Sequence, residues 1–229
     1  MGLEAIEFTT GADPSAPPVA SVVVLHGLGA DGHDFAPIAH EVDLSAIGSV
    51  RWVLPHAPVR PVSLNGGYAM RAWYDIYPPP SAPGVPRRED VPGLRAACQQ
   101  VQALLDREVQ RGIPARRTVL MGFSQGCAMA LMAGLRAPQR LAGVVGLSGY
   151  LPLADTTAQE RSIANQHVPI FMAHGTGDSV VLPERGIASC RVLQDLGYAV
   201  EWHGYPMEHS VCAQEVAELN TWLLRVLAA

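Results

Sequence analysis

Charged side chains are scarce in this sequence, and no stretch of it is strongly basic. Of its 229 residues 16% are charged, and 21 acidic residues against 16 lysines and arginines give a formal net charge of −5. A protein that binds nucleic acid through the phosphate backbone needs a concentrated basic surface. The lack of such a surface argues against nucleic acid as a partner.

The sequence also lacks a long apolar segment. Hydrophobic residues make up 48% of the chain, but they are divided into runs far shorter than the roughly 20 residues that cross a bilayer. The first residues do not show a basic stretch followed by an apolar one, which is the pattern of a secretory leader. We therefore expect no transmembrane segment and a cytoplasmic protein.

Cysteine and metal-ligand patterns are equally sparse. The four cysteines form no C-x-x-C pair, so neither a disulfide framework nor a zinc site is indicated, and we expect free thiols in a reducing compartment. His33 and His40 lie near Asp31 and Asp34, but without H-E-x-x-H or a comparable ligand spacing. A metal-assisted hydrolase is disfavoured, and no metal or cofactor is predicted.

Short apolar runs alternate with helical patterns along most of the chain. Strands are expected over residues 19–26, 50–54, 118–123, 141–147, 168–173 and 199–203. Helices are expected over residues 94–111, 125–136, 183–196 and 211–227, with Pro or Gly at several of their ends. This alternation predicts the α/β class, with a mainly parallel sheet covered on both faces. The length fits a single domain over residues 1–229.

A G-x-S-x-G pentapeptide occurs at Gly122-Phe123-Ser124-Gln125-Gly126, between an expected strand and an expected helix. The five-residue pattern alone is weak because Gly and Ser are common. A sharp turn between a strand and a helix, however, exposes the serine hydroxyl at the carboxyl end of the strand. The amides of the new helix then point toward the reaction site and favour negative charge there. Ser124 is therefore the predicted nucleophile.

A serine hydroxyl needs a base, and the downstream loops supply candidates. Asp178 follows the strand expected to end at residue 173, and His209 follows the last expected strand. Both would lie at the same sheet edge as Ser124, in the order Ser, Asp, His of α/β hydrolases. We predict that His209 transfers the proton and Asp178 orients the imidazole. Asp155 is the second choice for the acid, and Glu208 is disfavoured.

The segment Gly27-Leu28-Gly29-Ala30-Asp31-Gly32 fits G-x-G-x-x-G and follows the first long strand. As a dinucleotide site it would also need an acidic residue at the end of the next strand, about 20 residues on. That strand ends at Leu54-Pro55-His56, without an acid. In a hydrolase the same loop donates an amide to the oxyanion. We predict Leu28 as one donor and Gln125, directly after the nucleophile, as the other.

Together these motifs resemble the phospholipase/carboxylesterase family, which includes small bacterial carboxylesterases and the acyl-protein thioesterases. The resemblance runs from about residue 22 to residue 220. The segments that carry it are His26 to Gly32, Gly122 to Gly126, His174-Gly175 with Asp178, Met207-Glu208-His209, and Gly66-Gly67 with Met70 and Ala72-Trp73-Tyr74-Asp75-Ile76. The last of these is similar to the W-[FY]-D signature of the family's substrate loop.

The resemblance implies an α/β-hydrolase fold without a large lid domain. It also implies cleavage of short- to medium-chain acyl esters, with lysophospholipids and acylated cysteines as further substrates. Ser124, Asp178, His209, Leu28 and Gln125 fall on the family's functional positions. Two departures stand out: Cys127 occupies a place where Gly or Ala is more usual, and residues 77–92 form a longer, proline-rich segment.

An apolar groove for the acyl chain is expected beside the nucleophile. Its candidate residues lie near the inferred site along the chain: Leu28, Leu64, Met70, Trp73, Val180 and Val181. Trp73 and Met70 have an alternative role as ordinary core residues, because large apolar side chains usually lie in the core. If Trp73 lines the groove, its replacement by alanine should affect medium acyl chains more than acetate.

An active serine hydrolase is the leading interpretation, with a small-molecule acyl ester or thioester as substrate. Transfer of the acyl group to an acceptor other than water uses the same triad, and the sequence does not separate the two. A non-catalytic binding protein is disfavoured because all three triad residues are present. A homodimer is left open, since the sequence gives no count of exposed apolar surface.

Overall fold

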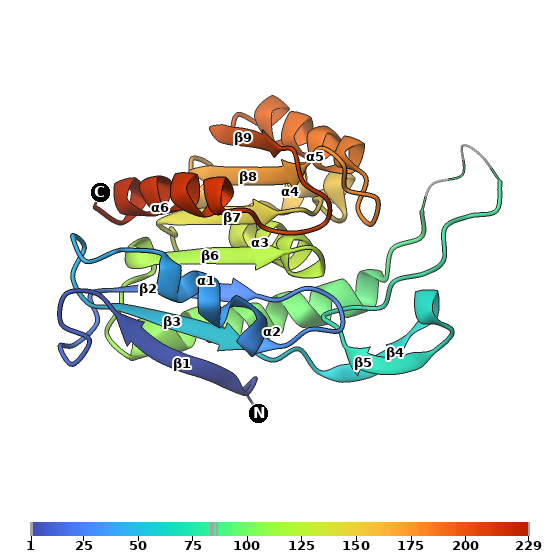
Figure 1. The fold of residues 1–229 in the computed structure, drawn as a ribbon. Coiled ribbons are helices and arrows are strands. Elements are labelled where there is room, and N and C mark those ends of the chain that lie inside the picture. Colours follow the sequence, from blue (N-terminus) through green and yellow to red (C-terminus); the bar gives the residue numbers. More distant parts are fainter. Residues whose placement is uncertain (1, 83–84, 86, 229) are drawn as a thin grey trace.

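A seven-stranded sheet forms the centre of the computed structural model, which describes residues 2–82, 85 and 87–228 (Figure 1). The strands, in spatial order, are β1 (Ala5–Thr10), β3 (Val50–Pro55), β2 (Ala20–Leu25), β6 (Thr118–Phe123), β7 (Gly143–Leu147), β8 (Ile170–Gly175) and β9 (Val200–Tyr205). Each neighbouring pair is parallel except β1 with β3, which is antiparallel. The predicted α/β class with a mainly parallel sheet is confirmed.

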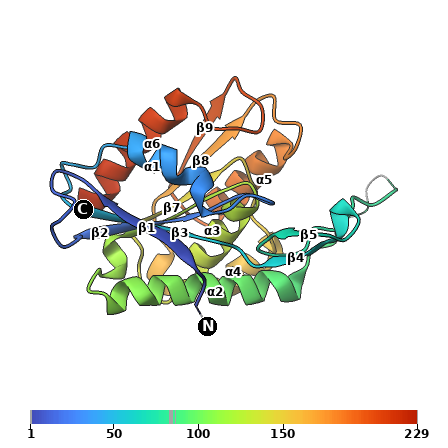
Figure 2. The ribbon, with the colours of Figure 1, turned by 60° about the horizontal axis from the view of Figure 1, so that its bottom comes forward.

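Helices cover both faces of this sheet. In Figure 2, α2 (Val91–Gln110) lies on one side of the sheet, and α1 (Ala36–Glu41) and α6 (Ala213–Ala228) lie on the other. The helices α3 (Gln125–Arg136) and α5 (Pro183–Asp195) pack on the α2 side. The short helix α4 covers Thr157–Glu160, and the 3-10 turns cover Gly32–Phe35, Ser63–Asn65, Ala115–Arg117, Ala154–Thr156 and Ile163–Asn165.

Burial on both faces explains why the central strands are continuous apolar runs rather than alternating ones. All six residues of β2 are buried. Its side chains alternate between the two faces of the sheet, as the pleat requires. Val23 and Leu25 belong to the core on the α3 side, and Val22 and Val24 belong to the core on the α6 side. Each face thus has its own hydrophobic core.

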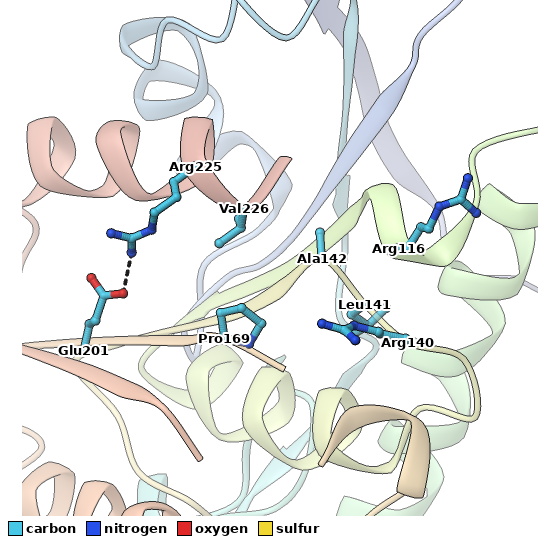
Figure 3. A pocket seen from close by; sticks show the side chains of 8 residues that line it. All are labelled: Arg116, Arg140, Leu141, Ala142, Pro169, Glu201, Arg225 and Val226. Atoms are coloured by element: carbon cyan, nitrogen blue, oxygen red, sulfur yellow. Dashed lines mark hydrogen bonds and ion pairs between the residues drawn. The ribbon is translucent and has the colours of Figure 1, made fainter. Parts of the chain in front are cut away.

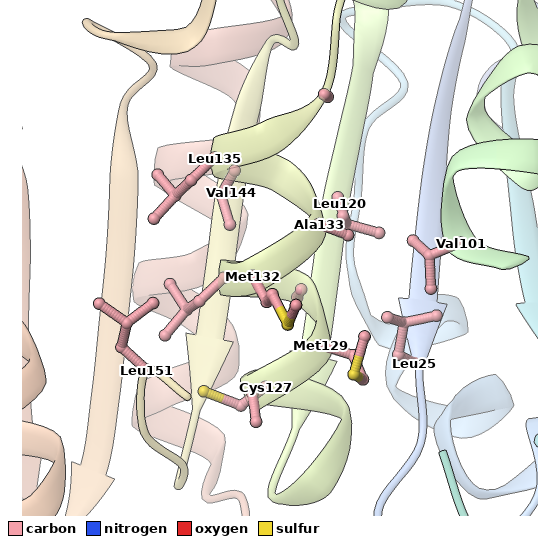
Figure 4. Close-up of a cluster of buried hydrophobic side chains, with 14 of the residues drawn as sticks. Leu25, Val101, Leu120, Cys127, Met129, Met132, Ala133, Leu135, Val144 and Leu151 are labelled. Atoms are coloured by element: carbon pink, nitrogen blue, oxygen red, sulfur yellow. The ribbon is translucent and has the colours of Figure 1, made fainter. Parts of the chain in front are cut away.

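Cys127 lies in the core on the α3 side, in the first turn of α3, near Leu151 (Figure 4). A Cβ added to Gly149 would come within 2.5 Å of the Cys127 Cβ, so the glycine leaves the room that the thiol occupies. Burial raises the pKa of the Cys127 thiol. Because only the thiolate is strongly nucleophilic, this cysteine is a packing residue despite its place three positions after Ser124.

All six predicted strands and all four predicted long helices are present, with ends shifted by three residues or fewer. The sequence did not predict β1 or a two-stranded hairpin after β3, because their sequence signals are weak. The edge strand β1 is half-buried and includes Glu7 and threonines. Residues 55–92, for which no strand or helix is expected from the sequence, contain the hairpin of β4 (Val59–Val62) and β5 (Tyr68–Arg71), whose first strand carries Pro61. Proline is tolerated in such a two-stranded hairpin because both strands are edges.

Candidate active site

The nucleophile candidate Ser124 occupies a strained turn between β6 and α3. Its backbone has φ 55° and ψ −116°, a conformation that costs a non-glycine residue about 1–3 kcal/mol. Its N–H donates to Leu147 O on the neighbouring strand at 2.8 Å. A Cβ on Gly122 would lie 2.1 Å from Gly126 O, and one on Gly126 would lie 2.0 Å from Leu25 O. Both glycines of the pentapeptide are therefore required by close backbone approach.

Ser124, His209 and Asp178 form one hydrogen-bonded chain. The Ser124 Oγ lies 2.9 Å from His209 Nε2, and His209 Nδ1 lies 2.6 Å from Asp178 Oδ2. The Asp178 side chain is fully buried, whereas that of His209 is 17% exposed. The three residues come from the carboxyl ends of β6, β8 and β9, separated by as many as 85 positions in the chain. This is the geometry of a nucleophile, a base and an orienting carboxylate.

Backbone amides hold the Asp178 carboxylate in place. Its Oδ1 accepts hydrogen bonds from the N–H groups of Val180 and Val181, both at 2.9 Å. His174 Nε2 lies 2.7 Å from Val181 O and 3.3 Å from Asp178 Oδ2. These contacts leave Oδ2 directed at His209. The alternative acids, Asp155 and Glu208, are exposed and are not hydrogen-bonded to His209.

The loop after β2 lies against Ser124. A Cβ on Gly27 would meet the Ser124 Cβ at 3.4 Å. His26 braces this loop: its Nε2 accepts the Ala57 N–H at 3.0 Å, so its Nδ1 carries the proton and donates to Gly27 O at 2.7 Å. Burial lowers the pKa of His26, which favours this neutral form. Among the residues that the structure describes, none accepts a hydrogen bond from the Leu28 or Gln125 N–H.

The side chain of Gln125 has a structural role that the sequence did not indicate. Its Oε1 accepts the Trp73 N–H at 2.9 Å, and its Nε2 donates to Tyr74 O at 2.8 Å. The Trp73 indole in turn donates to His26 O at 2.9 Å. The chain segment after β5 is thereby fixed to Gln125 at the start of α3 and to His26 directly after β2. No local pattern predicts such contacts, because they join residues about 50 positions apart.

A cavity of about 300 Å³ opens beside Ser124 and His209. Of the predicted groove residues, Leu28, Leu64, Val180 and Val181 line it. The further lining side chains were not predicted: Asp34, Tyr74, Ile76, Arg87, Phe123, Tyr150 and Arg185. Leu64 lies in the turn of the β4–β5 hairpin. This hairpin therefore contributes a wall of the cavity.

Met70 and Trp73, also predicted for the groove, do not line this cavity. The Trp73 side chain is fully buried in the core on the α3 side, where its indole braces His26. The Met70 sulfur packs near Gly29 and accepts from Asn65 Nδ2 at 3.6 Å. Both large side chains therefore support the loops from beneath and do not contact the cavity.

Replacement of Trp73 by alanine is accordingly expected to destabilise the whole protein. Emptying a fully buried tryptophan site costs about 3–5 kcal/mol of unfolding free energy. Activity on acetate and octanoate esters should fall together as the brace on His26 is lost. Urea denaturation and parallel assays of the two esters measure both effects. A stable variant that loses only octanoate activity would mean that Trp73 contacts the acyl chain in the groove.

A second cavity, of about 540 Å³, lies at the opposite edge of the sheet (Figure 3). Several of its residues lie just before strands, as with Arg116 before β6, Ala142 before β7 and Pro169 before β8, and others lie in α6. Ser124, Asp178 and His209 follow the carboxyl ends of β6, β8 and β9, so this cavity is separate from them. The described residues contain no cluster of three or more potential metal ligands. In the same part of the chain, no helix is long and apolar enough to span a membrane.

Comparison with known proteins identifies similar chains. Residues 10–227 match the family model described as Phospholipase/Carboxylesterase. The chain is 38% identical to acyl-protein thioesterase 1 of Cryptococcus neoformans over 228 residues, covering 93% of this chain and 95% of the relative. The crystal structure of Arabidopsis thaliana SOBER1 aligns with a TM-score of 0.84 at 32% identity, covering 91% of this chain and 99% of that one. That of Zea mays acyl-protein thioesterase 2 aligns with a TM-score of 0.82 at 29% identity, covering 98% and 100%.

Proposed function

The chain belongs to the phospholipase/carboxylesterase family of α/β hydrolases, and on this basis we propose that it hydrolyses carboxylic esters through a Ser124–His209–Asp178 triad. The observation that carries the proposal is the continuous hydrogen-bonded chain from Ser124 Oγ through the imidazole to a buried carboxylate. A largely apolar cavity, sized for a small acyl group, opens on the hydroxyl. Both features are needed for acyl transfer to serine.

The first half-reaction forms an acyl-enzyme. Ser124 Oγ attacks the acyl carbon while its proton passes to His209 Nε2, and the carbonyl oxygen becomes an oxyanion. Asp178 stabilises the imidazolium through the 2.6 Å contact with Nδ1. The bond to the leaving group then breaks, and His209 returns the proton to that oxygen or sulfur. The product is an ester between the acyl group and Ser124.

In the second half-reaction, water hydrolyses the acyl-enzyme and takes the place that Ser124 had as nucleophile. His209 takes a proton from the water that attacks the acyl-enzyme, then gives it to Ser124 Oγ as the acid leaves. In both halves the oxyanion is bound by the Leu28 and Gln125 N–H groups. Their lack of a protein acceptor supports this assignment. Each such donor contributes about 3 kcal/mol to the transition state.

We expect esters with short to medium acyl chains to be the best substrates. The cavity of about 300 Å³ is at the lower end of the usual range for ligand sites. With p-nitrophenyl esters, kcat/KM should be highest between butyrate and octanoate and about tenfold lower at palmitate, because a long chain overfills the cavity. A folded protein that is inert on every ester in this series would overturn the proposed function.

Leu64 provides the matched test of the acyl groove. Leu64→Gln should lower kcat/KM for octanoate by about fivefold, because apolar contact is lost, and leave acetate nearly unchanged. Leu182→Gln is the control, since Leu182 is similarly exposed, 52% against 44%, but does not line the cavity. Equal effects of the two substitutions would contradict this location of the acyl chain.

Acyl thioesters are the second candidate substrates. The observation that favours them is the similarity to proteins named acyl-protein thioesterases over nearly the whole chain. The same triad cleaves both bond types, and the thiolate is the better leaving group. Octanoyl esters and octanoyl thioesters of matched serine and cysteine peptides would rank the two activities. Added alcohol in the same assay would reveal acyl transfer as an ester product.

A further inference from the structure

One wall of the cavity beside Ser124 carries a cation that the proposed hydrolysis of neutral esters does not use. Arg185 lies in the first turn of α5, seven positions after Asp178, and lines the same cavity as Ser124 and His209. Arg185 and Tyr150 also line two adjoining hollows, one toward Asp90 and one toward Val192. Arg185 therefore lies where the cavity extends away from Ser124 and His209.

The Arg185 side chain is held by an aromatic platform. Its guanidinium carbon lies 3.5 Å from the centre of the Tyr150 ring. The Tyr150 hydroxyl is hydrogen-bonded to the Tyr74 hydroxyl at 2.8 Å, and Tyr74 is buried. Stacking on a ring leaves the edge of the guanidinium free to donate. The donors are thus fixed in advance, which lowers the entropy lost when a ligand binds.

No acidic side chain forms a close ion pair with this guanidinium among the described residues. Within the described part of the chain, no carboxylate lies within 4.0 Å of it, and its N–H groups make no hydrogen bond to the protein. The nearby acid Glu89 directs its carboxylate to the Leu153 N–H at 3.1 Å. Partial burial raises the pKa of Glu89, while the charge of Arg185 acts in the opposite direction.

The other acids around these hollows are engaged elsewhere or are exposed. Asp75 accepts from the N–H and the hydroxyl of Ser63, and Asp90 accepts from the N–H groups of Asp75 and Gly93. Asp155 and Asp34 are exposed to solvent. The second cation that lines the cavity, Arg87, adds positive charge. Among the residues that line the cavity beside Ser124, these two arginines are accompanied by a single carboxylate, that of Asp34.

We propose that Arg185, seated on Tyr150, is a specificity-determining residue that binds a carboxylate or phosphate group carried by the ester substrate. The inference rests on the proposed function, because it concerns the substrate of the same site. A guanidinium presents two parallel N–H donors that match the oxygens of either anion. An acyl groove for neutral chains needs no such cation, and partly burying an unpaired charge is unfavourable.

Two pairs of substrates test the proposal and locate the anion. The first pair is the p-nitrophenyl monoester of suberic acid and its methyl ester, which places the charge on the acyl side. The second is octanoyl glycerol phosphate and octanoyl glycerol, which places it on the alcohol side. In at least one pair the wild type should favour the anionic member by about tenfold in kcat/KM, the effect of one partly screened charge-assisted contact.

Arg185→Gln should abolish that preference, and Arg185→Lys should retain part of it, because the lysine keeps the charge but not the planar fork. Arg116→Gln is the matched control, since it removes one exposed arginine at the opposite edge of the sheet (Figure 3). It should leave the preference unchanged. Added salt should reduce the wild-type preference. Thermal unfolding of each variant verifies that it is folded.

The outcomes separate this inference from the proposed function. A wild type that hydrolyses the neutral esters but shows no preference for the anionic member in either pair overturns the role of Arg185 alone. So does an Arg185→Gln variant that loses activity on both members of a pair equally, because the preference would then be intact and the role structural. A wild type that hydrolyses none of the four compounds, nor any p-nitrophenyl ester, overturns the proposed function itself.

Discussion

Ser124→Ala is expected to lower kcat for p-nitrophenyl butyrate by about 10⁶-fold, the size of effect found when a triad nucleophile is removed. In the proposed mechanism this hydroxyl is the attacking group, and no other hydroxyl is hydrogen-bonded to His209 among the described residues. The oxyanion donors and the cavity would remain, so a small rate above that of water should persist. Initial rates at saturating ester measure the loss.

Ser148→Ala is the matched control for this experiment. Ser148 also has a positive φ, of 48°, and follows β7, the strand next to β6. Its hydroxyl is buried and has no hydrogen-bond partner, and it does not line the cavity. This variant should retain nearly full activity. An active Ser124→Ala variant, or a Ser148→Ala variant with the larger loss, would mean that Ser124 is not the nucleophile.

Asp178→Asn should lower kcat by about 10⁴-fold with little change in the fold, as expected when an orienting carboxylate becomes an amide. The carboxylate accepts the Val180 and Val181 N–H groups on one oxygen and faces His209 Nδ1 with the other. An amide has only one oxygen. If that oxygen accepts the two backbone donors, its NH₂ faces His209, the imidazole adopts the wrong tautomer, and Nε2 can no longer take the serine proton.

The control for Asp178→Asn is the same change at Asp155, the second-choice acid of the sequence analysis. Asp155 is exposed and makes no contact with His209, so Asp155→Asn should leave kcat unchanged. Steady-state assays of both variants at neutral pH decide between them. A large loss at Asp155, or an Asp178→Asn variant within about tenfold of wild type, would contradict the triad.

The parts of the site that could be predicted from the sequence depend on chain order and local pattern. The strand, turn and helix around Ser124 are continuous in sequence, and glycines flank the serine because a Cβ would clash. Asp178 and His209 each follow a strand, and parallel strands bring their carboxyl ends to one edge. Chain order alone therefore predicts that the three side chains lie in one region. The structure then brings them into hydrogen-bond contact.

The parts that could not be predicted depend on contacts between distant segments. Trp73 has the size and place expected of a groove residue, but its side chain turns into the core and braces His26. Arg185 and Tyr150 are 35 positions apart in sequence, and neither has a pattern that suggests stacking. The β4–β5 hairpin lacks the clear alternation of a strand pair. Its four-residue strands and Pro61 give only a weak signal.

Covalent labelling shows directly whether Ser124 is the activated nucleophile. A fluorophosphonate reacts with a serine only when a neighbouring base activates the hydroxyl. Intact-mass analysis of the labelled wild type should show a single adduct in step with loss of esterase activity, and peptide mapping should place it on Ser124. His209→Ala should abolish the labelling. An adduct on another residue, or full inhibition without modification of Ser124, would contradict the account.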